Sequence, residues 1–273
     1  MYRHPPLRLQ GRAKAIEDYW SAYENVFEKE ADMVSYLDAV TMPASGAWAY
    51  GRIPKTGTHT VLTALHRLEF GTNLTAVVHL PNNASENMAP HLLDEAGVFM
   101  SPLQAHHSPS TLDQALRFTI LRDPVKRAVS SFLYLCYSHK IGARQFAPTR
   151  LRMSAMLGFN WETDPNTAVG LEKMVRFVSA SQEIKRFKLD RHIAPQTSTL
   201  NRDIFAPNIT GRTEELARFF PALADELGVP GFRSLQFDAR NTSKDEPPFI
   251  VNHRLRSTIE TVYSDDMNWY NSV

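Results

Sequence analysis

The chain has 273 residues, of which 43% are hydrophobic and 22% charged, and its formal net charge at pH 7 is +1. This length is enough to bury the core of one large α/β domain. The nearly balanced charge argues against a dedicated nucleic-acid-binding protein, which needs a strong basic excess. Cys136 is the single cysteine, which excludes an intramolecular disulfide and a cysteine-based zinc site. Its apolar neighbours predict a buried thiol.

The sequence contains no stretch close to the roughly 20 apolar residues that a membrane span requires. Residues 1–6 carry no apolar run after their basic residues, and so do not form a secretory signal. We therefore expect a soluble protein. We expect it in the cytoplasm, or in the Golgi lumen if a targeting segment was removed.

Apolar side chains recur between residues 13 and 40 at the spacing of an amphipathic helix, which predicts one or two helices outside the main sheet. We expect residues 1–46 to form a helical extension packed on a single domain that covers residues 47–273. No repeat, low-complexity tract or linker-like composition divides the chain further.

Strand and helix patterns alternate through the rest of the sequence. Candidate strands cover residues 47–53, 74–80, 97–100, 116–121 and 204–209. Candidate helices cover residues 60–70, 124–139, 170–180, 213–227 and 254–263. We expect Asp123 to cap the second of these helices and Pro124 to occupy its first turn. Residues 141–166 read as an irregular insertion or lid.

This alternation predicts an α/β fold, a P-loop-like arrangement of three layers in which helices flank a central, mostly parallel sheet. Ligands of such sheets bind at the carboxyl ends of the strands. Two of these ends, which are followed by Lys55 and Arg122, carry cationic residues.

The first cationic end is the loop Pro54-Lys55-Thr56-Gly57-Thr58-His59-Thr60. A strand–turn–helix junction directs backbone N–H groups and a helix N-terminus at an anion. Lysine adds a full charge, glycine permits close approach, and the threonines add hydroxyl donors. The loop lacks the Gly-x-x-x-x-Gly-Lys-Ser/Thr pattern of nucleoside triphosphatases and its magnesium-binding hydroxyl. We therefore expect a phosphate ligand bound without a metal.

The second cationic end places Arg122 at a strand terminus and Ser130 about two turns along the following helix. A guanidinium with a nearby hydroxyl is suited to a second phosphate. Two anion sites on neighbouring strands fit a nucleotide that is phosphorylated at two separate positions.

Together the segments Ile53-Pro54-Lys55-Thr56-Gly57-Thr58 and Ile120-Leu121-Arg122-Asp123-Pro124-Val125-Lys126-Arg127-Ala128-Val129-Ser130 resemble the paired nucleotide-binding elements of carbohydrate sulfotransferases, the family that includes the heparan sulfate 2-O- and 6-O-sulfotransferases. The co-substrate of that family is 3′-phosphoadenosine 5′-phosphosulfate (PAPS). The resemblance implies that Lys55, Gly57, Thr58 and Thr60, with Thr56 and His59 of the same loop, hold the 5′-phosphosulfate. It implies that Arg122 and Ser130 hold the 3′-phosphate.

Three later segments extend the resemblance to about residue 270. The segment Arg191-His192-Ile193-Ala194-Pro195-Gln196 is similar to a family segment with His, an aromatic residue, Pro and Gln. The segment Asn241-Thr242-Ser243-Lys244 is similar to a polar loop that closes over the nucleotide, which implies contacts from Thr242, Ser243 and Lys244. Residues 263–267 also fit. Two departures are His59, where the family has Ser, Thr or Gly, and Ile193, where it has an aromatic residue.

The resemblance also implies a histidine base a little upstream of the Arg-Asp-Pro strand. His107 fits best because Pro109 follows it at the family's offset, and His106 is the alternate. A positioned histidine base contributes a factor of about 10² to 10⁴ to a rate. Two exposed or structural loop histidines are the other interpretation. Adjacent histidines without a nearby carboxylate do not suit a metal.

Taken together, the sequence predicts an enzyme that transfers a sulfuryl group from PAPS to a hydroxyl-bearing acceptor, for which the resemblance implies a carbohydrate. Three alternatives stay open. A small-molecule kinase of related fold would require Mg²⁺ and ATP, and a nucleotide-binding protein without turnover would lack a working base. A sulfotransferase that acts on a small metabolite also fits the motifs.

Overall fold

A computed structural model describes residues 11–79, 87–184, 188–202, 204–229, 232 and 247–273. As far as they are described, these residues form two compact units. The first unit comprises Met1–Ile53, Gly57–Ile120 and Leu200–Asn241, and the second comprises Pro54–Thr56, Leu121–Thr199 and Thr242–Val273. The expected extension over residues 1–46 and single domain over residues 47–273 stay predictions.

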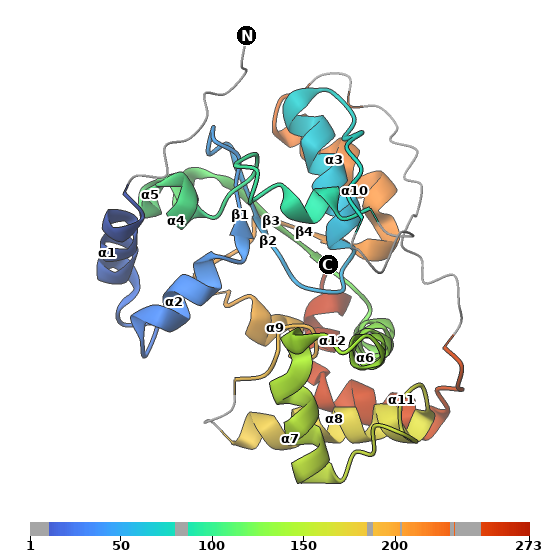
Figure 1. Cartoon of the computed structure of the whole chain (residues 1–273). Coiled ribbons are helices and arrows are strands. Elements are labelled where there is room, and N and C mark those ends of the chain that lie inside the picture. Colours follow the sequence, from blue (N-terminus) through green and yellow to red (C-terminus); the bar gives the residue numbers. More distant parts are fainter. Residues whose placement is uncertain (1–10, 80–86, 185–187, 203, 230–231, 233–246) are drawn as a thin grey trace. The chain divides into compact units, whose positions relative to one another are not determined.

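A four-stranded sheet in the order β1-β2-β3-β4 forms the centre of the fold, which confirms the predicted α/β class with a mostly parallel sheet flanked by helices (Figure 1). Strands β1 and β2 pair antiparallel, with Val40 opposite Gly51. Strands β2 and β3 pair in parallel, with Trp48 opposite Leu116. The strands are β1 (Val40–Thr41), β2 (Trp48–Gly51), β3 (Leu116–Leu121) and β4 (Ile209–Arg212).

Helices α3 (Thr58–Phe70) and α10 (Leu216–Glu226) lie on the same side of the sheet (Figure 1). They bury one cluster of apolar side chains with β2 and β3, because both helices present an apolar stripe toward the strands. The best buried members of the cluster are Trp48, Tyr50, Val61, Leu65, Phe118, Ile120, Phe220 and Leu223.

The N-terminal helices of the first unit pack against short helices that lie between β2 and β3 in the chain. The hydroxyl of Tyr19 donates to the carbonyl of Ser108 at 3.1 Å, and Ser101 donates to Asp38 at the same distance. The helices of this group are α1 (Arg12–Tyr23), α2 (Glu30–Leu37), α4 (Pro102–Ala105) and α5 (Pro109–Gln114). The expectation of one or two helices between residues 13 and 40 is therefore confirmed, with α1 and α2 as the observed pair. The 3₁₀ helices of this unit are η1 (Ala89–Leu92) and η3 (Thr213–Glu215).

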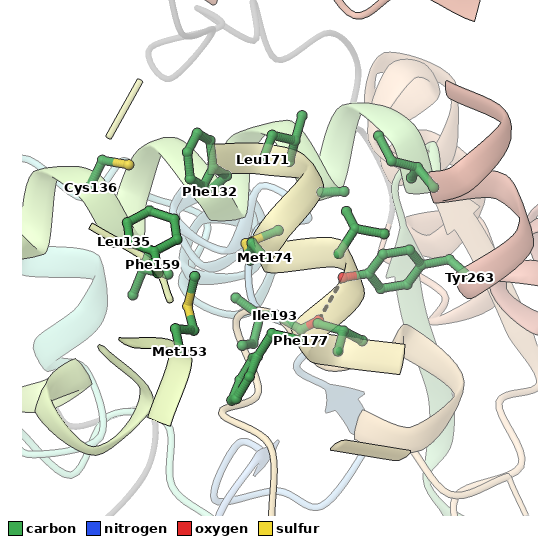
Figure 2. Close-up of a cluster of buried hydrophobic side chains, with 14 of the residues drawn as sticks. Phe132, Leu135, Cys136, Met153, Phe159, Leu171, Met174, Phe177, Ile193 and Tyr263 are labelled. Atoms are coloured by element: carbon green, nitrogen blue, oxygen red, sulfur yellow. Dashed lines mark hydrogen bonds between the residues drawn. The ribbon is translucent and has the colours of Figure 1, made fainter. Parts of the chain in front are cut away.

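The described secondary structure of the second unit is helical apart from the end of β3. Its core gathers side chains from four helices, and Figure 2 shows Phe132, Leu171, Met174 and Phe177 within it. Cys136 is buried in this core as predicted, and burial raises the pKa of its thiol to about 11. The elements are α6 (Pro124–Lys140), η2 (Arg144–Phe146), α7 (Ala147–Leu157), α8 (Ala168–Glu183), α9 (Gln196–Thr199), α11 (His253–Val262) and α12 (Ser264–Asn271).

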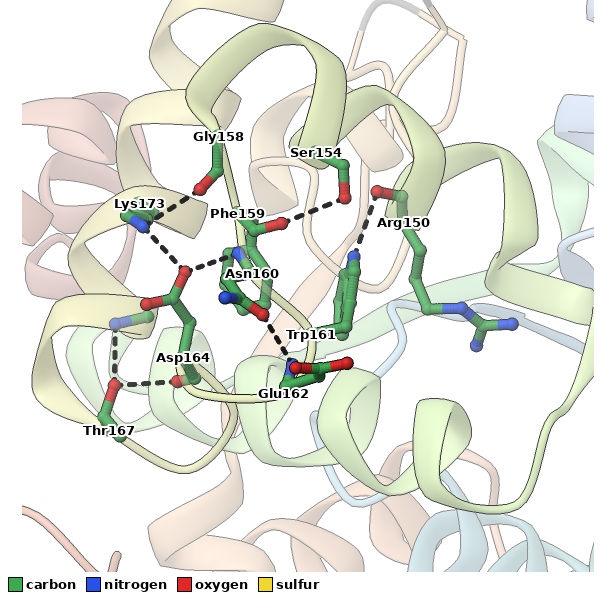
Figure 3. Close-up of polar contacts among 11 residues, drawn as sticks. Arg150, Ser154, Gly158, Phe159, Asn160, Trp161, Glu162, Asp164, Thr167 and Lys173 are labelled. Carbon is green, nitrogen blue, oxygen red and sulfur yellow. Dashed lines mark hydrogen bonds and ion pairs between the residues drawn. The ribbon is translucent and has the colours of Figure 1, made fainter.

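A set of polar contacts ties the turn between α7 and α8 to α8 itself (Figure 3). The carboxylate of Asp164 accepts from Nζ of Lys173 and from the backbone N–H of Asn160, both at 2.7 Å. Burial alone would raise the pKa of Asp164, but these hydrogen bonds and the Lys173 charge outweigh burial and lower it. The ionised carboxylate therefore contributes to the stability of the turn.

Four expectations about secondary structure were wrong. Residues 74–79 form no strand, because Val77 and Val78 are exposed and have no core face to cover. In the segment 97–100, only Met100 forms a bridge, to Met42. The strand expected over residues 204–209 begins instead at Ile209, because Pro207 has no N–H for a ladder. Residues 141–166 contain η2 and α7, and their side chains Phe146, Met153 and Phe159 enter the core.

The structure confirms the helix boundaries that matter for the site. Asp123 caps α6 by accepting from the backbone N–H of Lys126 at 2.8 Å, and Pro124 is the first helical residue. Among the described helices, none combines the length and the apolar composition that crossing a membrane requires.

Candidate functional site

The loop after β2 enters α3 through two residues with left-handed backbone conformation. Lys55 has a φ of 71°, and Gly57, the N-cap residue of α3, has a φ of 80°. Glycine adopts this region freely, whereas a residue with a Cβ is disfavoured there by about 1–2 kcal/mol. The predicted strand–turn–helix is confirmed, and the half-buried Lys55 lies in the chain just before the anion-favouring end of a helix.

The three threonines of the loop differ in what their hydroxyls can reach. Thr56 is fully buried, so its hydroxyl does not face solvent. Thr58 donates to the carbonyl of Ile53 at 3.4 Å, which is a long hydrogen bond that a charged acceptor could replace. Thr60 is half-buried in the first turn of α3.

His59 anchors the start of α3 to a neighbouring segment of the first unit. Its Nε2 lies 2.9 Å from the carbonyl oxygen of Asn87. A carbonyl only accepts, so Nε2 carries the proton. The ring also lies 5.9 Å from the ring of His91. This contact gives the departure at His59 a structural role that the sequence did not reveal.

The structure brings Lys55 and Arg122 together within the second unit. Nη1 of Arg122 donates to the backbone carbonyl of Lys55 at 3.2 Å. The side-chain amide of Gln196 holds the backbone of Arg122 from both sides: it accepts from the N–H and donates to the carbonyl, each at 3.0 Å. The two cationic elements found in the sequence are thus parts of one hydrogen-bonded arrangement.

A buried arginine, Arg127, donates hydrogen bonds to the backbone on both sides of this arrangement in the chain, before Lys55 and before Gln196. It is 1% exposed and donates to the carbonyls of Pro54 at 3.1 Å, Ala194 at 2.8 Å and Arg191 at 3.0 Å. Burial lowers the pKa of Arg127, and the nearby charge of Asp266 opposes that effect. Arg127 therefore connects the residue before Lys55 to the segment 191–194.

The carboxylate of Asp266 completes the buried frame. It accepts from the backbone N–H of Gln196 at 2.7 Å and from the N–H and hydroxyl of Thr197, each at 2.9 Å. Tyr263 donates to the carbonyl of Ile193 at 2.8 Å (Figure 2). The frame consists of Arg127, Gln196, Tyr263 and Asp266, and we call it the buried polar frame.

Aromatic contacts extend from Lys55 to His192 within the same unit. Nζ of Lys55 lies 4.3 Å from the centroid of the Tyr134 ring, which is a cation–π contact. The Tyr134 ring centroid lies 5.4 Å from that of His192. Nδ1 of His192 is 2.8 Å from Oδ1 of Asp190.

The other residues expected at the site are placed as follows. Ser130 is half-buried on α6 in the second unit, whereas His106 and His107 belong to the first unit. Nε2 of His107 donates to the carbonyl of Pro43 at 3.0 Å, so Nδ1 is its proton-accepting nitrogen. Nε2 of His106 is buried and has no hydrogen-bond partner in the part of the chain that the structure describes. Thr242, Ser243 and Lys244 lie outside the described residues.

Sequence reasoning assigned no role to the members of the buried polar frame. Arg127 and Gln196 lie within the quoted motifs, but their contacts join residues more than 60 positions apart in the chain. The signal that could have revealed Arg127 is a charge on an apolar helix face, because Arg127 shares the buried face of α6 with Val125 and Ala128.

A comparison with protein families identifies the family of this chain. A family model described as the sulfotransferase family matches residues 46–271, which is most of the chain. No curated protein and no solved structure matches it. Among the described residues, no group of three or more His, Cys, Asp or Glu side chains could hold a metal ion. With the family match covering both cationic elements and the buried polar frame, the chain belongs to the sulfotransferase family.

Proposed function

We propose that this enzyme transfers a sulfuryl group from PAPS to the hydroxyl of an acceptor. The observation that carries the proposal is the contact of the Arg122 guanidinium with the Lys55 carbonyl, inside a chain that belongs to the sulfotransferase family. Two cationic side chains on one frame suit a ligand with two separate phosphates better than a single anion.

The proposed nucleotide contacts follow the two elements. Lys55, Gly57, Thr58 and Thr60 hold the 5′ end, with Thr56 and His59 shaping the loop. Arg122 and Ser130 hold the 3′-phosphate, and Thr242, Ser243 and Lys244 close over the nucleotide. Lys55 and Arg122 are both cationic and half-buried, which supports this assignment. A phosphate ligand needs a positive charge that it can reach from solvent.

Charge and placement supply most of the rate in such an in-line displacement. Lys55 neutralises the charge that grows on the departing 5′-phosphate. His107 is the base expected from the resemblance, acting through Nδ1, and His106 is its alternate. The acceptor is a hydroxyl compound, and the resemblance to heparan sulfate enzymes favours a carbohydrate.

Calorimetry tests the nucleotide assignment. The protein is titrated with 3′-phosphoadenosine 5′-phosphate and with ATP, each with and without Mg²⁺. The proposal predicts metal-independent preference for the bisphosphate, whereas preference for Mg-ATP would support a kinase and end the proposal. Lys55→Ala and Arg122→Ala should each weaken bisphosphate binding by about 10- to 100-fold, as expected for a lost charged hydrogen bond. Lys140→Ala, an exposed charge at the end of α6, is the matched control.

A further inference from the structure

The side chains of Asp190 and His192 form a carboxylate–imidazole pair in the second unit. Oδ1 of Asp190 lies 2.8 Å from Nδ1 of His192 and also accepts the backbone N–H of His192 at 2.9 Å. A carboxylate beside Nδ1 fixes the proton there and leaves Nε2 as the basic nitrogen. No group in the described part of the chain forms a hydrogen bond with Nε2. The side chain of His192 is 23% exposed, so this nitrogen belongs to a partly accessible ring.

The backbone that carries His192 is held rigidly. Four successive carbonyls, from residue 191 to residue 194, each accept a hydrogen bond from a side chain of α6 or from Tyr263. Arg127 binds the first and the last, Ser131 binds that of His192 at 2.5 Å, and Tyr263 binds that of Ile193. Catalytic groups are effective when buried contacts fix their position in advance.

The ring of Tyr134 links His192 to Lys55. The Tyr134 ring lies between them in the chain of contacts, at 4.3 Å from Nζ of Lys55 and 5.4 Å from the His192 ring centre. The distance from Nζ to the His192 ring centre therefore cannot exceed the sum of these two distances. Lys55 and His192 are therefore both direct neighbours of Tyr134 within the second unit.

We propose that His192, in place of the upstream His107, is the general base of the sulfuryl transfer, with Asp190 as its positioning residue; this inference rests on the proposed function. Nε2 of His192 takes the proton of the acceptor hydroxyl while the acceptor oxygen bonds to sulfur. The bond from sulfur to the 5′-phosphate oxygen breaks, and its electron pair stays on that phosphate beside Lys55. The carboxylate of Asp190 stabilises the imidazolium that forms.

His192 is better prepared for this role than the upstream histidines. Nε2 of His107 is held by a backbone carbonyl, and Nε2 of His106 is buried. Neither ring has a carboxylate hydrogen-bonded to it among the described residues. The Asp190–His192 pair combines a fixed tautomer with a partly exposed side chain.

The test compares His192→Ala with His107→Ala and with His139→Ala, a control that removes a histidine whose ring makes a tilted contact with Trp161 in the same unit. Turnover is measured with saturating PAPS, both for transfer to desulfated heparin and for hydrolysis by water. His192→Ala should lower kcat by about 10² to 10⁴-fold, and added imidazole should restore part of it. Affinity for 3′-phosphoadenosine 5′-phosphate should change by less than about twofold, because binding precedes proton transfer. His139→Ala should behave as the wild type.

A second readout does not depend on turnover. Long-range ¹H–¹⁵N spectra of histidine-labelled protein should show the His192 proton on Nδ1, and Asp190→Ala should remove that preference.

Three results would overturn the inference: a His192 ring protonated on Nε2, turnover unchanged in His192→Ala, or a loss of turnover that imidazole does not rescue. Loss of turnover in His107→Ala alone would return the role of base to His107 and leave the sulfotransferase proposal intact. A wild-type protein that neither binds the bisphosphate nor consumes PAPS would refute the proposed function itself.

Discussion

Replacing Arg127 with methionine removes the cation at the centre of the buried polar frame while keeping the length of the side chain. In the wild type the guanidinium satisfies the carbonyl of Ala194, which is buried, and those of Pro54 and Arg191, which are partly buried. Arg127→Met leaves all three acceptors without this donor. It also removes the positive charge whose interaction with Asp266 the structure indicates.

The expected cost follows from these contacts. A buried acceptor left unsatisfied costs about 1–3 kcal/mol, and a partly exposed one costs less because water can reach it. Methionine relieves the desolvation of the guanidinium, which offsets part of the loss. The net reduction in the free energy of unfolding should be about 3–5 kcal/mol, the range typical of breaking a buried charged network. For a chain of this size, that corresponds to a fall in Tm of about 10 °C.

Urea denaturation measures the loss, with Arg176→Met as the matched control. Arg176 pairs with Glu172 on the surface of α8, where its side chain is 60% exposed, so its replacement should change stability by less than about 0.5 kcal/mol. Arg127→Met should also weaken binding of 3′-phosphoadenosine 5′-phosphate, because Pro54 loses a support next to Lys55. A stability loss of less than about 1 kcal/mol, below the cost of one unsatisfied acceptor, would refute the role given to Arg127.

Three further predictions concern the second unit. Gly170→Ala places a Cβ 2.1 Å from the carbonyl oxygen of Asp164 and should lower the free energy of unfolding, measured by denaturation, by about 3 kcal/mol. Gly158→Ala is the control: its Cβ would meet open space, so only the penalty of about 1–2 kcal/mol for a left-handed backbone should appear. Asp164→Asn should cost about 1.5–3 kcal/mol at neutral pH, because it weakens the charged hydrogen bond to Lys173. The pKa of Asp164 is lowered in the folded state. The stability difference between the wild type and Asp164→Asn should therefore persist above the ordinary carboxyl pKa of 3.8 and disappear as the pH falls through the lower folded pKa. A stability difference that grows in acid would contradict the assignment. Cys136 should react with a thiol reagent only after unfolding, since burial raises its pKa to about 11, and rapid labelling of the native protein would contradict its burial.

Local signals predicted the parts of the fold that carry their own capping and turn residues. The strand before Arg122 and the helix after it were predicted closely because Asp123 and Pro124 mark the helix start. The loop at Lys55 was recognised from its lysine, its threonines and a glycine that permits close approach, whereas the left-handed conformation of Lys55 and Gly57 is known only from the structure. The segment 74–79 misled because β-branched residues favour strands only where one face is buried.

Contacts between distant segments could not be predicted in the same way. Helix α7 was missed because residues 141–166 read as an irregular insertion; its first turn contains Pro148, which is tolerated there. Lys55 and Arg122 were selected as candidate site residues from their motifs, but the frame that joins them was not predicted. Gln196 reaches Arg122 across 74 positions, and no spacing rule specifies such a partner.

The most direct measurement of the central claim is the conversion of PAPS to 3′-phosphoadenosine 5′-phosphate by the purified protein, with mass spectrometry of the acceptor in the same reaction. The account predicts bisphosphate release without added metal, matched by a sulfated hydroxyl on the acceptor. It also predicts that Lys55→Ala loses the activity while Lys140→Ala keeps it. Binding of ATP with Mg²⁺ in place of PAPS, or PAPS turnover that is unchanged in Lys55→Ala, would contradict the account.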